Sequence, residues 1–175
     1  RGIEALTPRI NALIESAQGI LDAVGLAAHH RVDRLAVGEA DLTAELGINP
    51  ATGTHGLWPL RMQLVVASAA AAIAAPVAPV QTDIPDLEHL RRTSKELAAA
   101  GFGARSAIHP TQIPVINEVF APSPDDVAWA ENLIADFAAR TDDGLGVFTD
   151  AAGSMVDEAV VRRARRIVAA AGQYA

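Results

Sequence analysis

The chain has 175 residues, of which 14 are Lys or Arg and 21 are Asp or Glu, so its formal net charge is −7. This length suits one hydrophobic core, and a hydrophobic content of 50% argues against disorder. The absence of cysteine excludes disulfides, thiolate catalysis and cysteine-based metal sites. The one basic cluster lies in a helical pattern within an acidic chain, so we expect no nucleic-acid partner. That cluster consists of Arg162, Arg163, Arg165 and Arg166.

Neither the N-terminal residues nor the most apolar stretch of the chain indicates a membrane protein. Residues 1–8 lack the long apolar run of a signal peptide. The most apolar stretch, residues 64–80, contains Pro76 and Pro79 and is too short and too interrupted to span a bilayer. We therefore expect a cytoplasmic protein that does not contact membranes.

Short apolar runs alternate with helical patterns in the first hundred residues. A helix N-cap is expected at Asp86, and Gly101 is expected at the C′ position that ends the same helix. Before this helix, the pattern predicts strands over 10–14, 32–37 and 76–80, helices over 20–28 and 60–75, and a loop over 47–59.

The alternation continues to the C-terminus. A strand is expected over 105–108, and a fifth strand or extended segment over 144–148. Ser123 followed by Pro124 is a strong helix start, and Asp157 begins a last helix that ends at Gly172. Strands that alternate with helices predict βαβ units, and hence an α/β fold with a parallel sheet.

Three residues that can carry chemistry lie after the C-terminal ends of predicted strands. Glu15 follows the first strand, Asp41 the second and His109 the fourth. In (β/α) barrels, functional residues lie at the C-terminal ends of strands, and consecutive parallel strands are usually neighbours. Glu15 and Asp41 can therefore converge at one edge of the sheet. Two carboxylates with open positions suit Mg²⁺, a hard cation that prefers oxygen ligands.

Each candidate also has a purely structural interpretation. A carboxylate at a strand end is often the cap of the next helix or a solvated loop acid, and we expect Glu39 and Glu45 to be solvated. For His109, a hydrogen-bonded structural role is favoured. Capping is the first interpretation of Asp157 from position alone. Lys95 lies in an exposed helical pattern, which argues against Schiff-base chemistry within this chain.

Five segments in order resemble the citrate lyase β-subunit-like proteins of the wider HpcH/HpaI aldolase superfamily. Any one of these motifs would be weak evidence, but the ordered set covers nearly the whole chain. The five segments are residues 13–19 (LIESAQG), 35–42 (LAVGEADL), 101–102 (GF) with 107–113 (AIHPTQI), 120–123 (FAPS) and 153–157 (GSMVD).

The resemblance implies a Mg²⁺-dependent carbon–carbon lyase that cleaves or forms 3-hydroxyacyl-CoA thioesters such as citryl-, malyl- or citramalyl-CoA. Glu15 and Asp41 match the family's two metal ligands. Asp157 matches a catalytic acid that reaches the active site of a neighbouring subunit, which implies a homo-oligomer, by analogy a trimer. The segment with His109 and Gln112 matches a region near the CoA side, without a catalytic role.

The resemblance also implies a (β/α)₈ TIM barrel, of which we expect this chain to cover roughly the C-terminal half plus a helical extension. Residues 1–150 would form the C-terminal part of the barrel, and residues 151–175 would form a C-terminal segment that carries the MVD motif and the last helix. We expect the upstream strands and a substrate-contacting Arg to lie outside this chain. Two alternatives stay open: a metal-dependent aldolase acting on free 4-hydroxy-2-oxo acids, and a catalytically silent lyase-like subunit.

Overall fold

The computed structural model describes residues 8–142, 147–149 and 153–172, which form two compact units divided between Phe120 and Ala121. The boundary predicted from the sequence lies later, at residue 150. Helix α7 (Pro124–Asp142) belongs with the second unit and packs against the last helix, α8 (Glu158–Ala171).

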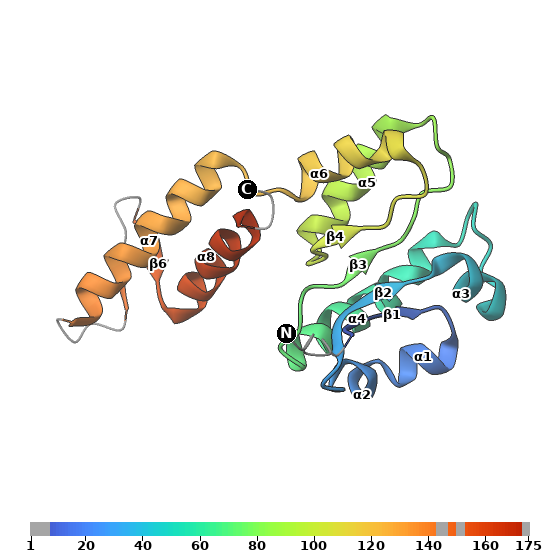
Figure 1. Ribbon diagram of the computed structural model, residues 1–175, viewed down its shortest axis with the longest axis horizontal. Helices are drawn as coiled ribbons and strands as arrows, with labels where there is room; N and C mark the ends of the chain where they lie inside the picture. Colours follow the sequence, from blue (N-terminus) through green and yellow to red (C-terminus); the bar gives the residue numbers. More distant parts are fainter. Residues whose placement is uncertain (1–7, 143–146, 150–152, 173–175) are drawn as a thin grey trace, which may run out of the picture. The chain divides into compact units, whose positions relative to one another are not determined.

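The first unit is built on a four-stranded parallel sheet in the order β1-β2-β3-β4 (Figure 1). This arrangement confirms the predicted α/β fold with consecutive strands as neighbours. The strands are β1 (Ile10–Ile14), β2 (Val32–Val37), β3 (Val77–Ala78) and β4 (Ala104–Arg105), and the helices are α1 (Ala17–Leu21), α2 (Ala23–Ala27), α3 (Glu39–Leu46), η1 (Thr54–Gly56), α4 (Leu57–Ala70), α5 (Leu87–Ala99), η2 (Pro110–Gln112) and α6 (Ile113–Phe120).

Strands β1 and β2 have the predicted bounds, whereas β3 and β4 are shorter than predicted. Pro76 and Pro79 flank β3, and proline has no N–H to donate to a sheet ladder. Strand β4 ends at Arg105, and the Ile108 N–H instead donates to the Gln112 side chain at 3.0 Å. The prediction of a strand over 105–108 was therefore wrong in its extent.

The predicted helix over 20–28 begins earlier and is broken. The Ser16 hydroxyl caps α1 by accepting a hydrogen bond from Gly19 N at 3.1 Å, so the helix begins at Ala17. Asp22 interrupts it with φ −90° and ψ 1°, and α2 follows. Helix α4 begins three residues before the predicted Leu60, because Pro59 is tolerated in a first helical turn. Helix α6 was not predicted.

The core of the first unit lies between the sheet and the helices. Leu35 and Val37 of β2 pack with buried residues of α2 and α4, among them Ala27 and Leu64. Leu13, next to the buried Ile14, is 55% exposed. Side chains alternate between the faces of a strand, so this sheet buries one face under its helices and leaves part of the other open.

The second unit consists of two packed helices and a small antiparallel hairpin. Helix α7 (Pro124–Asp142) begins at Pro124 with Ser123 as its cap, as predicted, and the Ser123 hydroxyl accepts a hydrogen bond from Asp126 N at 3.1 Å. Helix α8 is capped by Asp157 and ends at Gly172, also as predicted. Its bounds are Glu158–Ala171, and those of the paired strands are β5 (Phe148–Thr149) and β6 (Met155–Val156).

The predicted fifth strand over 144–148 lies partly outside the described residues. Phe148, at the end of the predicted segment, lies in β5, which pairs antiparallel with β6 and forms a separate two-stranded sheet. Leu133 and Phe137 of α7 pack against Val161 and Ala164 of α8, which gives the second unit its own core. No helix among the described residues is long and apolar enough to cross a membrane.

Candidate metal site at the strand ends

Glu15 and Asp41 lie at the same edge of the parallel sheet. Glu15 directly follows β1, and Asp41 is in the first turn of α3, which begins two residues after β2 ends. The two strands pair in parallel with Ile14 opposite Val37, and Gly38 N donates to Ile14 O at 2.9 Å. The ends of the two strands therefore lie side by side, as the predicted strand order requires.

The Glu15 side chain lies directly against Gly38. A Cβ atom added to Gly38 would be 2.6 Å from the Glu15 Cβ atom and 3.0 Å from Glu15 Oε2. Only glycine leaves that space open, so Gly38 permits the close approach of the Glu15 carboxylate to the α3 N-terminus. Gly38 lies three residues before Asp41, so the residue that makes room for Glu15 belongs to the same segment as Asp41.

Both carboxylates are exposed, and neither has a hydrogen-bond or ion-pair partner among the described residues. They remain available to an external ligand. No group of three or more His, Cys, Asp or Glu side chains among the described residues forms a metal cluster. A cation held by Glu15 and Asp41 would therefore complete its shell with other oxygens, which suits Mg²⁺ because it usually retains several waters.

Glu45 fixes the turn that follows Glu15. Its Oε2 accepts a hydrogen bond from Ala17 N at 3.1 Å and thereby joins the end of α3 to the start of α1. Because Asp41 is one helical turn before Glu45, this bond connects the segments that carry the two candidate ligands. Glu45 is exposed, as expected, but it is not merely solvated. Nothing in its sequence context signalled this contact, which spans 28 residues.

The expectation that Glu39 is a solvated acid was wrong. Arg61 of α4 binds both of its carboxylate oxygens, with Nη2 2.8 Å from Oε2, and the two side chains are only 14% and 17% exposed. The pair is close to neutral, and it removes Glu39 from the set of free carboxylates beside Asp41. Arg61 also stacks over the Trp58 ring at 4.9 Å from its centroid.

His109 has the structural role that the sequence favoured. Its Nδ1 accepts a hydrogen bond from Thr111 N at 3.3 Å and caps η2. Gln112 is fully buried; its Oε1 binds Ile108 N, and its Nε2 donates to Gln81 O at 3.0 Å. These contacts hold together the segments that follow β3 and β4.

Asp157 belongs to the second unit. Its Oδ1 accepts hydrogen bonds from Ala159 N at 2.8 Å and Val160 N at 3.1 Å, so the capping interpretation is confirmed. None of the hydrogen bonds within the described residues uses Oδ2. Asp157 is half-buried, and the backbone N–H groups of α8 fix its Oδ1, while Oδ2 has no partner in the part of the chain that the structure describes.

Comparison with known proteins decides the family. The family model described as HpcH/HpaI aldolase/citrate lyase matches residues 1–110. The chain belongs to this family. It is 34% identical to the mitochondrial citramalyl-CoA lyase of Rattus norvegicus over 164 residues, which are 89% of this chain and 48% of that protein. It is 32% identical to the (3S)-malyl-CoA thioesterase of Cereibacter sphaeroides, over 97% of this chain and 59% of the relative.

A solved structure of this family agrees with the fold. The CitE protein of Mycobacterium tuberculosis, in complex with magnesium, acetoacetate and coenzyme A, superposes with a TM-score of 0.74 at 31% identity, covering 94% of this chain and 61% of that one. The predicted fold class, part of a (β/α)₈ barrel, is thereby confirmed. The chain spans about half the length of the curated relatives it matches.

Proposed function

We propose that the protein to which this chain belongs is a Mg²⁺-dependent carbon–carbon lyase acting on a 3-hydroxyacyl-CoA thioester such as citramalyl-, malyl- or citryl-CoA. The observation that carries the proposal is the pair of carboxylates, Glu15 directly after β1 and Asp41 in the first turn of α3 after the adjacent β2, neither of which has a partner among the described residues. The names of the relatives, a citramalyl-CoA lyase and a malyl-CoA thioesterase, support the substrate class. The magnesium and coenzyme A bound to the mycobacterial structure support the same reaction.

In this proposal Glu15 and Asp41 hold the cation. Their oxygen-only donor set fits magnesium, as does the lack of any competing cationic partner among the described residues. Bound Mg²⁺ would supply Lewis-acid polarisation of the substrate oxygens and a template for their orientation. Gly38 leaves room for Glu15, and Glu45 fixes the turn after it, so these residues set the spacing of the two ligands.

Asp157 is the proposed acid and base. Cleavage breaks the bond between the hydroxyl-bearing carbon and the carbon beside the thioester carbonyl. The hydroxyl proton is released to water as the hydroxyl becomes the keto carbonyl, and the electron pair of the broken bond leaves with the acyl-CoA as an enolate. The protonated Asp157 would return a proton to the enolate carbon, and in condensation its carboxylate would remove that proton. The oxygen free of capping bonds, Oδ2, is suited to this exchange. We propose that Asp157 serves a neighbouring subunit in a homo-oligomer, by family analogy a trimer.

The test is product analysis with the intact protein. It would be incubated with Mg²⁺ and with citramalyl-, malyl- or citryl-CoA, and keto acid, acyl-CoA and free CoA would be followed separately by mass spectrometry. A lyase gives keto acid and acyl-CoA in equal amounts, and addition of EDTA abolishes both. Free CoA with an intact hydroxy acid would instead indicate thioester hydrolysis. The absence of every product would contradict the proposal for these substrates.

A further inference from the structure

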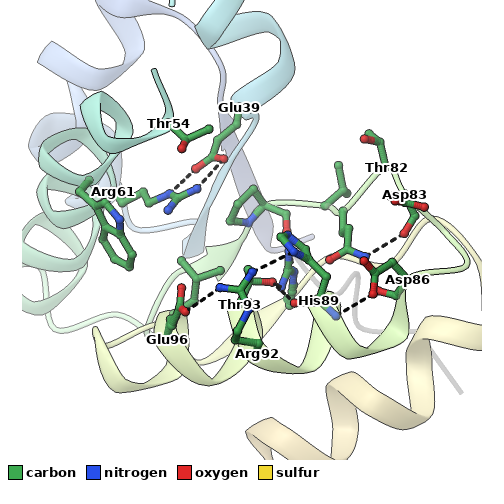
Figure 2. Close-up of a pocket in the computed structure, with 16 residues that line it drawn as sticks. Glu39, Thr54, Arg61, Thr82, Asp83, Asp86, His89, Arg92, Thr93 and Glu96 are labelled. Atoms are coloured by element: carbon green, nitrogen blue, oxygen red, sulfur yellow. Dashed lines mark hydrogen bonds and ion pairs between the residues drawn. The ribbon is translucent and has the colours of Figure 1, made fainter. Parts of the chain in front are cut away.

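The polar cleft of the first unit has no free cation among the residues that line it (Figure 2). Arg61 is paired with Glu39, and Arg92 with Glu96 at 3.1 Å. Arg105 donates to a backbone carbonyl and to two side-chain hydroxyl groups. The cleft therefore gives no site for the phosphate or carboxylate groups of the proposed substrate.

The second unit, in contrast, presents an apolar side chain beside the proposed acid and base. Met155 of β6 is 65% exposed, more than any other large hydrophobic side chain described in this unit. The next residue, Val156, is only 1% exposed and packs into the core between α7 and α8. Successive side chains of a strand point to opposite faces. Strand β6 therefore buries Val156 and presents Met155 on its open face.

Asp157 lies on the same face of the chain as Met155. The backbone of Asp157 continues the extended conformation of β6, with φ −131° and ψ −178°. Because side chains in extended backbone alternate with a period of two, residues 155 and 157 project to the same side. Two residues of strand span only about 6.6 Å. The long Met155 side chain can therefore reach the space in front of Asp157 Oδ2.

We infer that Met155 determines which acyl group the enzyme accepts, by packing against the carbon from which Asp157 removes a proton. The inference rests on the proposed function, in which Asp157 must come within hydrogen-bond distance of that proton. An acetyl group carries only hydrogens at this carbon and fits beside Met155. A propionyl group adds a methyl group there, which competes with Met155 for space. Met155 takes no part in the proton exchange itself and acts on specificity alone.

Competition between acetyl-CoA and propionyl-CoA tests this inference. The intact protein would condense an equal mixture of the two with glyoxylate, pyruvate or oxaloacetate in the presence of Mg²⁺. Mass spectrometry of the two hydroxyacyl-CoA products then gives the ratio of the kcat/KM values, which does not depend on the amount of active enzyme. Met155→Ala should raise the propionyl-to-acetyl ratio at least about tenfold, as expected for one methyl group in an apolar site. Met155→Leu keeps the volume and should keep the ratio close to that of the unaltered protein.

Met62→Ala is the matched control for the loss of an exposed methionine. Met62 is the other of the two methionines of the chain and is 38% exposed on α4. Its replacement should leave the ratio unchanged.

The outcomes separate this inference from the proposed function. If the unaltered protein forms no product with any of the three keto acids, the proposed function fails and this inference fails with it. If product forms, an unchanged or lower ratio in Met155→Ala, or the loss of both products, overturns this inference alone. An equal rise in Met62→Ala would also overturn it.

Discussion

Glu15 packs against Gly38 so closely that a methyl group at residue 38 would lie 2.6 Å from the Glu15 Cβ atom. Gly38→Ala should therefore displace the Glu15 carboxylate and weaken Mn²⁺ binding, measured by electron paramagnetic resonance, by about tenfold or more, corresponding to ~1.4 kcal/mol. Gly25→Ala is the matched control, because a Cβ atom at Gly25 meets nothing within 4 Å. Unchanged Mn²⁺ affinity in a folded Gly38→Ala protein would argue against Glu15 as a ligand.

The Glu45–Ala17 hydrogen bond predicts a graded response to substitution. Glu45→Ala removes the acceptor for Ala17 N, frees the turn after Glu15 and should lower Mn²⁺ affinity several-fold. Glu45→Gln retains a side-chain carbonyl oxygen that can accept the same bond, so it should restore most of the affinity. Both variants should cost no more than about 1 kcal/mol in unfolding free energy, measured by urea titration. If Glu45→Gln and Glu45→Ala bind Mn²⁺ equally weakly, then loss of the negative charge of Glu45, and not loss of the hydrogen bond, lowers the affinity.

Asp157 permits a clean separation of capping from catalysis. Asn is as good an N-cap as Asp, so Asp157→Asn should retain thermal stability and Mn²⁺ binding. It should nevertheless lose lyase turnover, because an amide cannot exchange the proton. Asp157→Ala should in addition lose about 1 kcal/mol of stability with the cap. Lyase turnover by Asp157→Asn at the rate of the unaltered protein would remove Asp157 from the proposed chemistry.

The Arg61–Glu39 pair should contribute to stability through its burial. Arg61→Met leaves a largely buried Glu39 without its partner, and we expect a loss of ~2–4 kcal/mol in unfolding free energy. The double variant Glu39→Gln with Arg61→Met should be less destabilised than the sum of the single variants, because neither charge is then stranded. Additive losses in urea titrations would show that the two side chains act independently.

The sequence predicted those parts of the fold that depend on local chemistry. Asp86 and Ser123 cap their helices, and Gly101 has φ +103° at the end of α5, since each of these signals acts within one helical turn. The positions of Glu15 and Asp41 followed from strand order. The Ser16 cap, which moved the start of the first helix to Ala17, was a local signal that the sequence offered and the prediction missed.

The remaining features depend on contacts between distant residues. Glu45 reaches Ala17 across 28 positions, and Arg61 reaches Glu39 across 22. Neither contact leaves a periodic or motif-like signal in the chain. The buried Gln112 side chain likewise donates to Gln81 O across 31 positions. Long-range packing therefore decided which acids are paired and which are free.

The most direct test of the central claim is Mn²⁺ binding by the single variants Glu15→Gln and Asp41→Asn. Each removes one carboxylate from the proposed pair while keeping its shape. We expect each variant to lower Mn²⁺ affinity at least about tenfold and to reduce lyase turnover in parallel. The control variant Asp136→Asn, at an exposed acid on α7, should change neither. Mn²⁺ affinity equal to that of the unaltered protein in both variants would contradict the claim that Glu15 and Asp41 hold the metal.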